Sequence, residues 1–153
     1  ADQSNGLTAQ HWDVYRTFLE MASELYLQIE RSLKAETGLT PSDMEVLVPL
    51  SEAPDQRLRP SELARKAGWS SSRVAHELRR LERRGWIVRG SFGTDQRGVT
   101  VHMTAAGWKK TTEALPIQEK AIKRALVDAL TEEELLVFGR LSQQIIQQIK
   151  SLR

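Results

Sequence analysis

The feature that most constrains this chain is residues 60–103, which have the pattern of two helices joined by a short turn and followed by a two-stranded hairpin. The second helix is predicted over residues 71–84. Ser70 is predicted to cap its start, because a serine hydroxyl accepts a hydrogen bond from an otherwise unpaired backbone N–H. Gly85 is predicted to end it, since glycine adopts the left-handed conformation without a steric penalty. This order predicts a helix-turn-helix followed by a β-wing.

The second helix has two chemically different faces. At about 100° per residue, Val74, Leu78 and Leu81 share one face, which is predicted to pack on the protein. The opposite face and its flanks carry side chains that donate to base edges and phosphates, and an α-helix fits the major groove of B-DNA. The predicted DNA contacts of this helix are Ser70, Ser71, Ser72, Arg73, His76, Arg79, Arg80 and Arg83.

Positive charge is concentrated around this helix. Residues 57–97 hold eleven basic and four acidic side chains, a net charge of +7, whereas the remainder of the chain has a net charge of −5. A basic face on one helix alone is also typical of an ordinary solvated surface. The surrounding charge favours nucleic-acid binding, which requires a basic patch.

Composition excludes several other classes of protein. A chain of 153 residues is predicted to form a single domain over 1–153. There is no cysteine, which excludes disulfides, thiolate zinc sites and cysteine redox switches. No apolar run approaches the roughly 20 residues of a membrane helix, and no signal peptide is visible in a chain that starts at Ala1. We therefore expect a soluble cytoplasmic protein without membrane contact.

The sequence offers little for catalysis. The three histidines, His11, His76 and His102, belong to different predicted elements, and none has a carboxylate or histidine at zinc-site spacing. No phosphate-binding loop, dinucleotide fingerprint or nucleophile motif occurs. We expect no enzyme activity, no cofactor and no metal.

Long helices are predicted on both sides of the central unit. The first covers residues 8–37, with an apolar seam at spacings of three and four residues: Trp12, Tyr15, Leu19, Ala22, Tyr26, Ile29 and Leu33. Helices over 105–153 begin after Thr104 and at the capping box of Thr131 and Glu134. Their apolar stripe continues almost to the C-terminus, which a monomer rarely needs. The fold class is therefore mainly α with a small β-wing, and a homodimer is expected.

This order of elements resembles the MarR family of bacterial transcription regulators, from about Thr8 to Ile149. Three local patterns carry the resemblance: a leucine-glutamate-x-x-glycine junction, an aspartate-x-arginine wing tip and a threonine-x-x-glycine helix start. They stand here as Leu81-Glu82-Arg83-Arg84-Gly85, Asp95-Gln96-Arg97 and Thr104-Ala105-Ala106-Gly107. Each pattern alone is weak, but all three occur in order at suitable spacing.

The resemblance implies a six-helix winged helix-turn-helix protein, with residues 40–103 as the DNA-binding unit and residues 8–37 and 105–153 as dimerisation helices. It implies a homodimer on a pseudo-palindromic operator, most often as a repressor. By the same analogy Asp95 and Arg97 pair at the wing tip, and the arginine enters the minor groove, whose narrow A·T tracts attract arginine.

Members of this family often respond to small aromatic or phenolic effectors. Near the start of the first helix, His11, Trp12, Tyr15 and Arg16 provide aromatic rings with a cation suited to a carboxylate. The same rings also fit a dimer core, and both interpretations stay open here. A further alternative for the whole chain is a winged-helix module that binds DNA without sequence preference or binds protein, because fold does not determine function.

Overall fold

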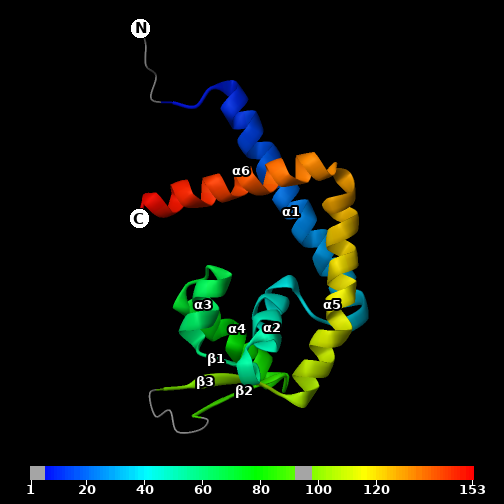
Figure 1. Ribbon diagram of the computed structural model, residues 1–153, viewed down its shortest axis with the longest axis vertical. Helices are drawn as coiled ribbons and strands as arrows, with labels where there is room; N and C mark the ends of the chain where they lie inside the picture. The colour runs from blue at the N-terminus through cyan, green and yellow to red at the C-terminus, as the bar shows by residue number, and fades with distance from the viewer. Residues whose placement is uncertain (1–5, 92–97) are drawn as a thin grey trace. The chain divides into compact units, whose positions relative to one another are not determined.

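A computed structural model of the chain describes residues 6–91 and 98–153 (Figure 1). The chain divides into two compact units. The winged unit contains residues 29–118, and the helical unit combines the residues up to 28 with residues 119–153. The described residues form six α-helices and a three-stranded sheet, which confirms the predicted fold class.

The winged unit carries α2, α3 and α4 on a small antiparallel sheet (Figure 1). Its helices are α2 (Pro41–Glu52), α3 (Pro60–Ala67) and α4 (Ser71–Arg83), with a single 3-10 turn, η1 (Pro54–Gln56), after α2. The strands are β1 (Arg57–Leu58), β2 (Ile87–Gly90) and β3 (Thr100–Met103), in the order β1-β3-β2. The short strand β1 pairs Leu58 with Val101, so it joins the β2–β3 hairpin, which we call the wing.

Capping residues determine where these helices begin. At α2, the Asp43 N–H donates to Thr40 Oγ1 at 3.2 Å and the Thr40 N–H donates to Asp43 Oδ2 at 2.8 Å, a capping box. At α4, the Arg73 N–H donates to Ser70 Oγ at 3.2 Å, as predicted. Gly85 has a φ of +76°, which allows the chain to leave α4 and enter β2.

The threonine-x-x-glycine pattern has a clear packing reason. The Thr104 hydroxyl donates to the Gly85 carbonyl at 2.7 Å and accepts from the Gly107 N–H at 3.0 Å. A Cβ added at Gly107 would lie 2.0 Å from the Trp86 carbonyl oxygen, so only glycine fits there. The pattern therefore holds the start of α5 (Ala105–Ala125) against the end of the wing.

The core of the winged unit is closed and apolar. Fully buried side chains come from α2, α3, α4 and the sheet, among them Met44, Leu47, Leu50, Leu63, Val74, Leu78, Leu81, Ile87 and Val101. The last turns of α1 (Ala9–Thr37) also belong to it, because Leu33 is fully buried there. The predicted seam of the first helix therefore ends in this core.

The helical unit is packed differently. It contains the first turns of α1, the end of α5, the 3-10 turn η2 (Val127–Ala129) and α6 (Glu132–Ser151). Thr131 caps α6 through the predicted box with Glu134. No residue of α6, all of which the structure describes, is buried. Within residues 6–91 and 98–153, none of the helices has the length and hydrophobicity of a transmembrane segment.

Candidate nucleic-acid interface

The two faces of α4 lie where the sequence predicts them. Val74, Leu78 and Leu81 are buried in the core of the winged unit. The solvent-exposed positions of the helix include Ser71, Ser72, Arg73, His76, Arg79 and Arg83. One face thus anchors the helix while the other presents hydroxyl, imidazole and guanidinium groups to the surroundings.

The start of α4 is locally ordered. The Ser70 hydroxyl caps the helix, and the hydroxyls of Ser70 and Ser72 lie 3.3 Å apart. The first N–H groups of a helix carry partial positive charge and favour an anion such as a phosphate. The cap therefore gives the exposed serines a defined position beside an electropositive helix end.

Arg73 is held by an aromatic neighbour. Its guanidinium carbon lies 4.0 Å from the centroid of the Trp69 ring, in the turn between α3 and α4. Trp69 is partly buried and packs against the core. Stacking of this kind restricts the guanidinium without using its N–H donors. Arg73 is thereby oriented and still able to donate.

Arg79 and Arg83 are one helical turn apart on α4, and both are exposed. Within residues 6–91 and 98–153, neither makes a hydrogen bond or an ion pair. His76 lies on the same exposed side. These three side chains are donors of α4 that make no hydrogen bond or ion pair in the part of the chain that the structure describes.

Arg80 has a different environment. Its Nη2 donates hydrogen bonds to Asp43 Oδ1 and, at 3.3 Å, to Thr40 Oγ1. The Arg80 side chain therefore bridges α4 and α2. Its Nε lies 3.7 Å from Glu77 Oε1. Asp43 is fully buried. Contact of Arg80 with DNA stays a prediction. Within the chain, its guanidinium joins two helices of the winged unit.

The carboxyl groups around Arg80 were missed by the sequence analysis. Burial, together with the hydrogen bond to and the negative charge of the neighbouring Asp43 carboxylate, raises the pKa of Glu77 to about 8 and favours its neutral form. Burial also opposes ionisation of Asp43, yet hydrogen bonds from Glu77, Arg80 and the Thr40 N–H lower its pKa below the usual value. Neutral Glu77 and ionised Asp43 together with Arg80 therefore form one buried network.

Two other basic residues of the +7 segment are also engaged. Arg84 stacks over the Trp86 ring at 4.0 Å and donates from Nη1 to the Gly38 carbonyl at 3.2 Å. Arg89 Nε is 2.8 Å from Glu82 Oε2. Part of the positive charge that the sequence shows thus holds the winged unit together, whereas Arg79 and Arg83 of α4 stay exposed.

The predicted wing-tip pair, Asp95 and Arg97, lies outside the described residues. The strands on either side of it, β2 and β3, pair in register from Gly90 with Thr100 to Ile87 with Met103.

The predicted effector residues occur together at the start of α1. The rings of Trp12 and Tyr15 meet edge to face with centroids 6.3 Å apart, and Arg16 lies 5.5 Å over the Trp12 ring. His11 Nδ1 accepts from the Thr8 N–H at 3.2 Å. Trp12 is 43% exposed and Tyr15 is 50% exposed. Our interpretation of these residues as an effector site stays a prediction, and so does the alternative that the two rings belong to a dimer core.

Comparison with known proteins decides the family. A sequence model of the MarR family matches residues 37–98. Sco3205, a MarR family transcriptional regulator from Streptomyces coelicolor solved in complex with DNA, is 31% identical, with 94% of each chain covered and a TM-score of 0.87. The chain belongs to the MarR family. AbsC, another MarR family regulator from the same organism, is 30% identical over 97% of this chain and 99% of its own, with a TM-score of 0.88.

A curated relative gives the same assignment over a shorter region. The transcriptional repressor MprA of Escherichia coli strain K12 is 29% identical over 119 residues, which is 78% of this chain. The match spans 66% of the length of MprA, just under two thirds. MarR family membership confirms the resemblance from which the sequence analysis argued, and it makes this chain a member of a family of transcription regulators.

Proposed function

We propose that the chain is a dimeric, sequence-specific DNA-binding regulator of transcription that acts in the cytoplasm, as a repressor, on a pseudo-palindromic operator. The observation that carries this proposal is α4, whose exposed side combines Arg79, Arg83 and His76 with a capped, electropositive start. The solved complex of Sco3205 with DNA supports it, because the two chains align over nearly their whole length.

In this proposal α4 lies in the major groove of DNA. The first residues of a recognition helix reach base edges, so Ser71, Ser72, Arg73, His76 and Arg79 are the proposed reading residues. Ser70, Arg80 and Arg83 are the further proposed contacts, with Arg83 on a phosphate. Asp95 and Arg97 are proposed to present the wing to the minor groove.

The proposed dimer uses the apolar surface of the helical unit. Large apolar side chains of α1 and α6 are exposed, including Trp12, Tyr15, Phe18, Leu19, Leu141, Ile145 and Ile149. Large apolar side chains exposed in this number are typical of a protein–protein contact. Two copies related by a two-fold axis would place their recognition helices about 34–36 Å apart, one turn of DNA.

An effector is the finer part of the proposal. We propose that a small aromatic acid binds beside Trp12 and Tyr15 with its carboxylate toward Arg16, whose cation already lies over the Trp12 ring. Burial of the same rings in the dimer is the competing arrangement. Calorimetric titration with salicylate-like acids separates the two. If no acid in the panel gives binding heat or changes DNA binding, the result would favour burial of the two rings in the dimer.

The test is a titration of the full chain with promoter DNA from beside its own gene, against a scrambled competitor at two salt concentrations. Arg79→Ala should weaken specific binding by about 1–3 kcal/mol, since an arginine paired with guanine is worth that much. The matched control is Arg140→Ala on α6, an exposed arginine outside the proposed interface. It should bind like the unaltered chain.

Other outcomes point elsewhere. Binding that scrambled DNA removes equally well indicates a basic architectural protein, because specific sites are typically about 10³–10⁷ tighter. Affinity that does not fall with salt would contradict phosphate contacts, since released counterions make binding salt-dependent. An absence of binding at low salt would rule out DNA as the partner.

A further inference from the structure

Two arginines of α4 reach residues 38–43, which lead from the end of α1 into the first turn of α2. Arg80 donates from Nη2 to Asp43 Oδ1 and, at 3.3 Å, to Thr40 Oγ1. Arg84, one helical turn further along, donates from Nη1 to the Gly38 carbonyl at 3.2 Å. Residues four apart lie on the same side of a helix. One side of α4 is therefore attached to this segment by two charged groups.

Asp43 is the centre of the attachment. Its side chain is completely buried, whereas the Arg80 side chain is 32% exposed. One carboxylate oxygen accepts from the Thr40 N–H at 2.8 Å, and the other accepts from Arg80. The capping box that starts α2 therefore also determines where the Arg80 guanidinium lies. Separating α4 from α2 would leave the buried Asp43 charge without its cation, which is strongly unfavourable.

Glu77 is the member of the network that can change its charge. It lies one turn before Arg80 on α4, and its buried Oε1 is 3.7 Å from Arg80 Nε. Within residues 6–91 and 98–153, this oxygen has no hydrogen-bond partner. The charged groups that act on Glu77 are Asp43 on α2 and Arg80 on α4 itself. With Glu77 neutral, the network has one carboxylate and one guanidinium. With Glu77 ionised, two carboxylates compete for that guanidinium.

We propose that Asp43 and Glu77 are positioning residues for DNA recognition, which fix the orientation of α4 through Arg80 only while Glu77 is neutral. The inference rests on the proposed function, because it concerns the same helix. It extends that function by making the reading of DNA depend on a proton that is held away from the DNA surface.

The orientation of α4 matters because its reading side chains lie on the side away from the core. Arg79 is the neighbour of Arg80 in the sequence and is exposed. Since α4 is a single helix, a rotation that moves Arg80 away from Asp43 turns Arg79 by the same angle. Recognition groups have to be held within about 0.5 Å and 10–20° of their working geometry. Contacts with phosphates carry no sequence information and tolerate such a rotation better.

The first experiment measures the affinity of the full chain for the promoter DNA and for the scrambled DNA from pH 7 to pH 9 at constant ionic strength. With a pKa of about 8, Glu77 keeps its proton in about a tenth of the chains at pH 9. If only those chains read the sequence, the affinity for promoter DNA falls roughly tenfold over this range. The affinity for scrambled DNA should fall much less.

Two variants of α4 show which group is responsible. Glu77→Gln has a neutral amide at every pH, so its affinity for promoter DNA should match that of the unaltered chain at pH 7 and lack the tenfold fall. Glu82→Gln changes an exposed glutamate of the same helix and is the matched control, which should keep the fall. A fall that Glu77→Gln shares would overturn the proposal. Equal falls for promoter and scrambled DNA would indicate charge repulsion alone and would also overturn it.

The second experiment tests whether Asp43 acts through Arg80. Asp43→Asn keeps an oxygen that can accept from the Thr40 N–H but removes the charge that holds Arg80. At pH 7 it should weaken promoter binding roughly tenfold, and in an Arg80→Gln chain the same change should cost less than about threefold. Losses that multiply independently would overturn the proposed route. If circular dichroism shows that Asp43→Asn is unfolded, the comparison of Glu77→Gln with the unaltered chain decides.

Failure of this inference can be distinguished from failure of the proposed function. If the unaltered chain at pH 7 prefers promoter DNA no more than scrambled DNA, the proposed function fails and the inference fails with it. If the chain does prefer promoter DNA, but equally at pH 7 and pH 9 where circular dichroism shows it folded, only the inference fails.

Discussion

The winged unit buries its apolar side chains within itself, whereas the helical unit leaves most of its own exposed. In the winged unit, Leu47, Leu63 and Leu78 are almost completely removed from water. In the helical unit, Leu141 and Ile145 remain 44% and 60% exposed. Apolar surface drives folding only where it is removed from water. The comparison shows that the winged unit completes its own core, while the helical unit leaves much of its apolar surface uncovered.

The ion pairs of the two units also differ in their exposure to solvent. In the winged unit, Arg80 joins Asp43 and Glu77 in a buried network. In the helical unit, the pairs of Arg16 with Asp13 and of Lys123 with Asp128 lie in solvent. Exposed pairs contribute about 0–1 kcal/mol, but removing one member of a buried pair costs several times more. Removing one charged group should therefore destabilise the buried network of the winged unit more than either exposed pair of the helical unit.

The largest effect that we expect compares two leucines. Leu47→Ala removes a fully buried side chain and should lower the free energy of unfolding by about 2–5 kcal/mol, because it leaves a cavity. Leu141→Ala makes the same change at an exposed position and should cost less than about 0.5 kcal/mol in dilute protein. Urea unfolding at low protein concentration measures both. Similar losses would mean that the helical unit is as fully packed as the winged one.

The second prediction tests the exposed side of α6. Ile145→Asp places a charge in the apolar stripe and should weaken self-association roughly hundredfold, since an unpaired carboxylate is costly to bury. Gln147→Asp adds the same charge on the other side of the helix and should leave association unchanged. Sedimentation equilibrium over a range of concentrations measures both constants. Two variants that associate equally would show that the stripe is not the dimer surface.

Much of the winged unit could be predicted because its signals are local. A cap such as Ser70 and a stop such as Gly85 act within a few residues, so the bounds of α4 follow from the sequence around them. The two faces of α4 follow from helical periodicity alone. The short strand β1 at residues 57–58 is harder to locate, because a two-residue strand has too little pattern in the sequence.

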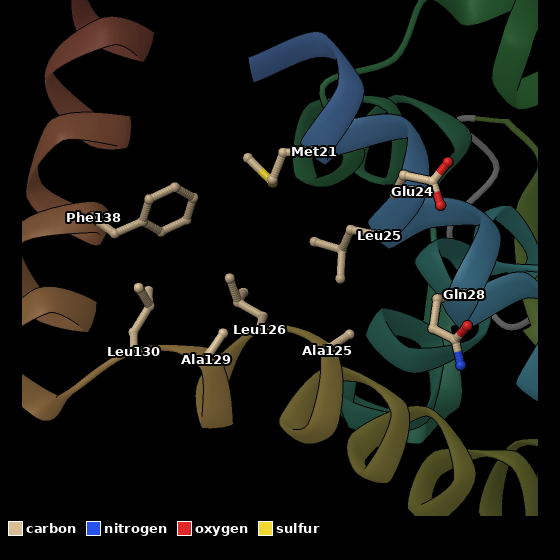
Figure 2. A pocket seen from close by; sticks show the side chains of 9 residues that line it. All are labelled: Met21, Glu24, Leu25, Gln28, Ala125, Leu126, Ala129, Leu130 and Phe138. Atoms are coloured by element: carbon tan, nitrogen blue, oxygen red, sulfur yellow. The ribbon is translucent and has the colours of Figure 1, made fainter. Parts of the chain in front are cut away.

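The buried network could not be predicted in the same way. Arg80 and Asp43 are 37 residues apart in the chain, so no local sequence pattern connects them. The available signal was Glu77, an acidic residue beside Leu81 on the apolar side of the helical wheel. A hollow of about 430 Å³ in the helical unit, between the middle of α1, η2 and the start of α6 (Figure 2), was also missed, because it depends on how the chain turns at η2 between α5 and α6.

The third prediction concerns pH. The pKa of Glu77 is raised from 4.5 to about 8, so between these values the folded chain holds a proton that the unfolded chain has lost. The free energy of unfolding should therefore fall as pH rises from 5 to 8, by on the order of 3 kcal/mol from this group. Glu77→Gln is neutral at every pH and should remove that part of the slope. Chemical unfolding at pH 5, 6, 7 and 8 measures it.

The control for this experiment is another glutamate of α4. Glu82 is exposed and pairs with Arg89, so Glu82→Gln should keep the pH dependence of the unaltered chain. If Glu77→Gln also keeps it, Glu77 is ionised in the folded protein, and the buried network holds two negative charges instead of one. That result would remove the contrast between buried and exposed charges that separates the two units.

The smallest effect that we expect comes from the helix caps, one in each unit. Ser70→Ala and Thr131→Ala each remove a side chain that accepts from a backbone N–H, at α4 and α6 respectively, and each should cost about 1 kcal/mol of local helix stability. Because α4 is the proposed reading helix and α6 the proposed dimer helix, the two losses should appear in different measurements. Ser70→Ala should weaken DNA binding by a chain that still associates, and Thr131→Ala should weaken association first. Equal changes in both measurements for both variants would mean that the two units share one stability, and that their different packing does not make them independent.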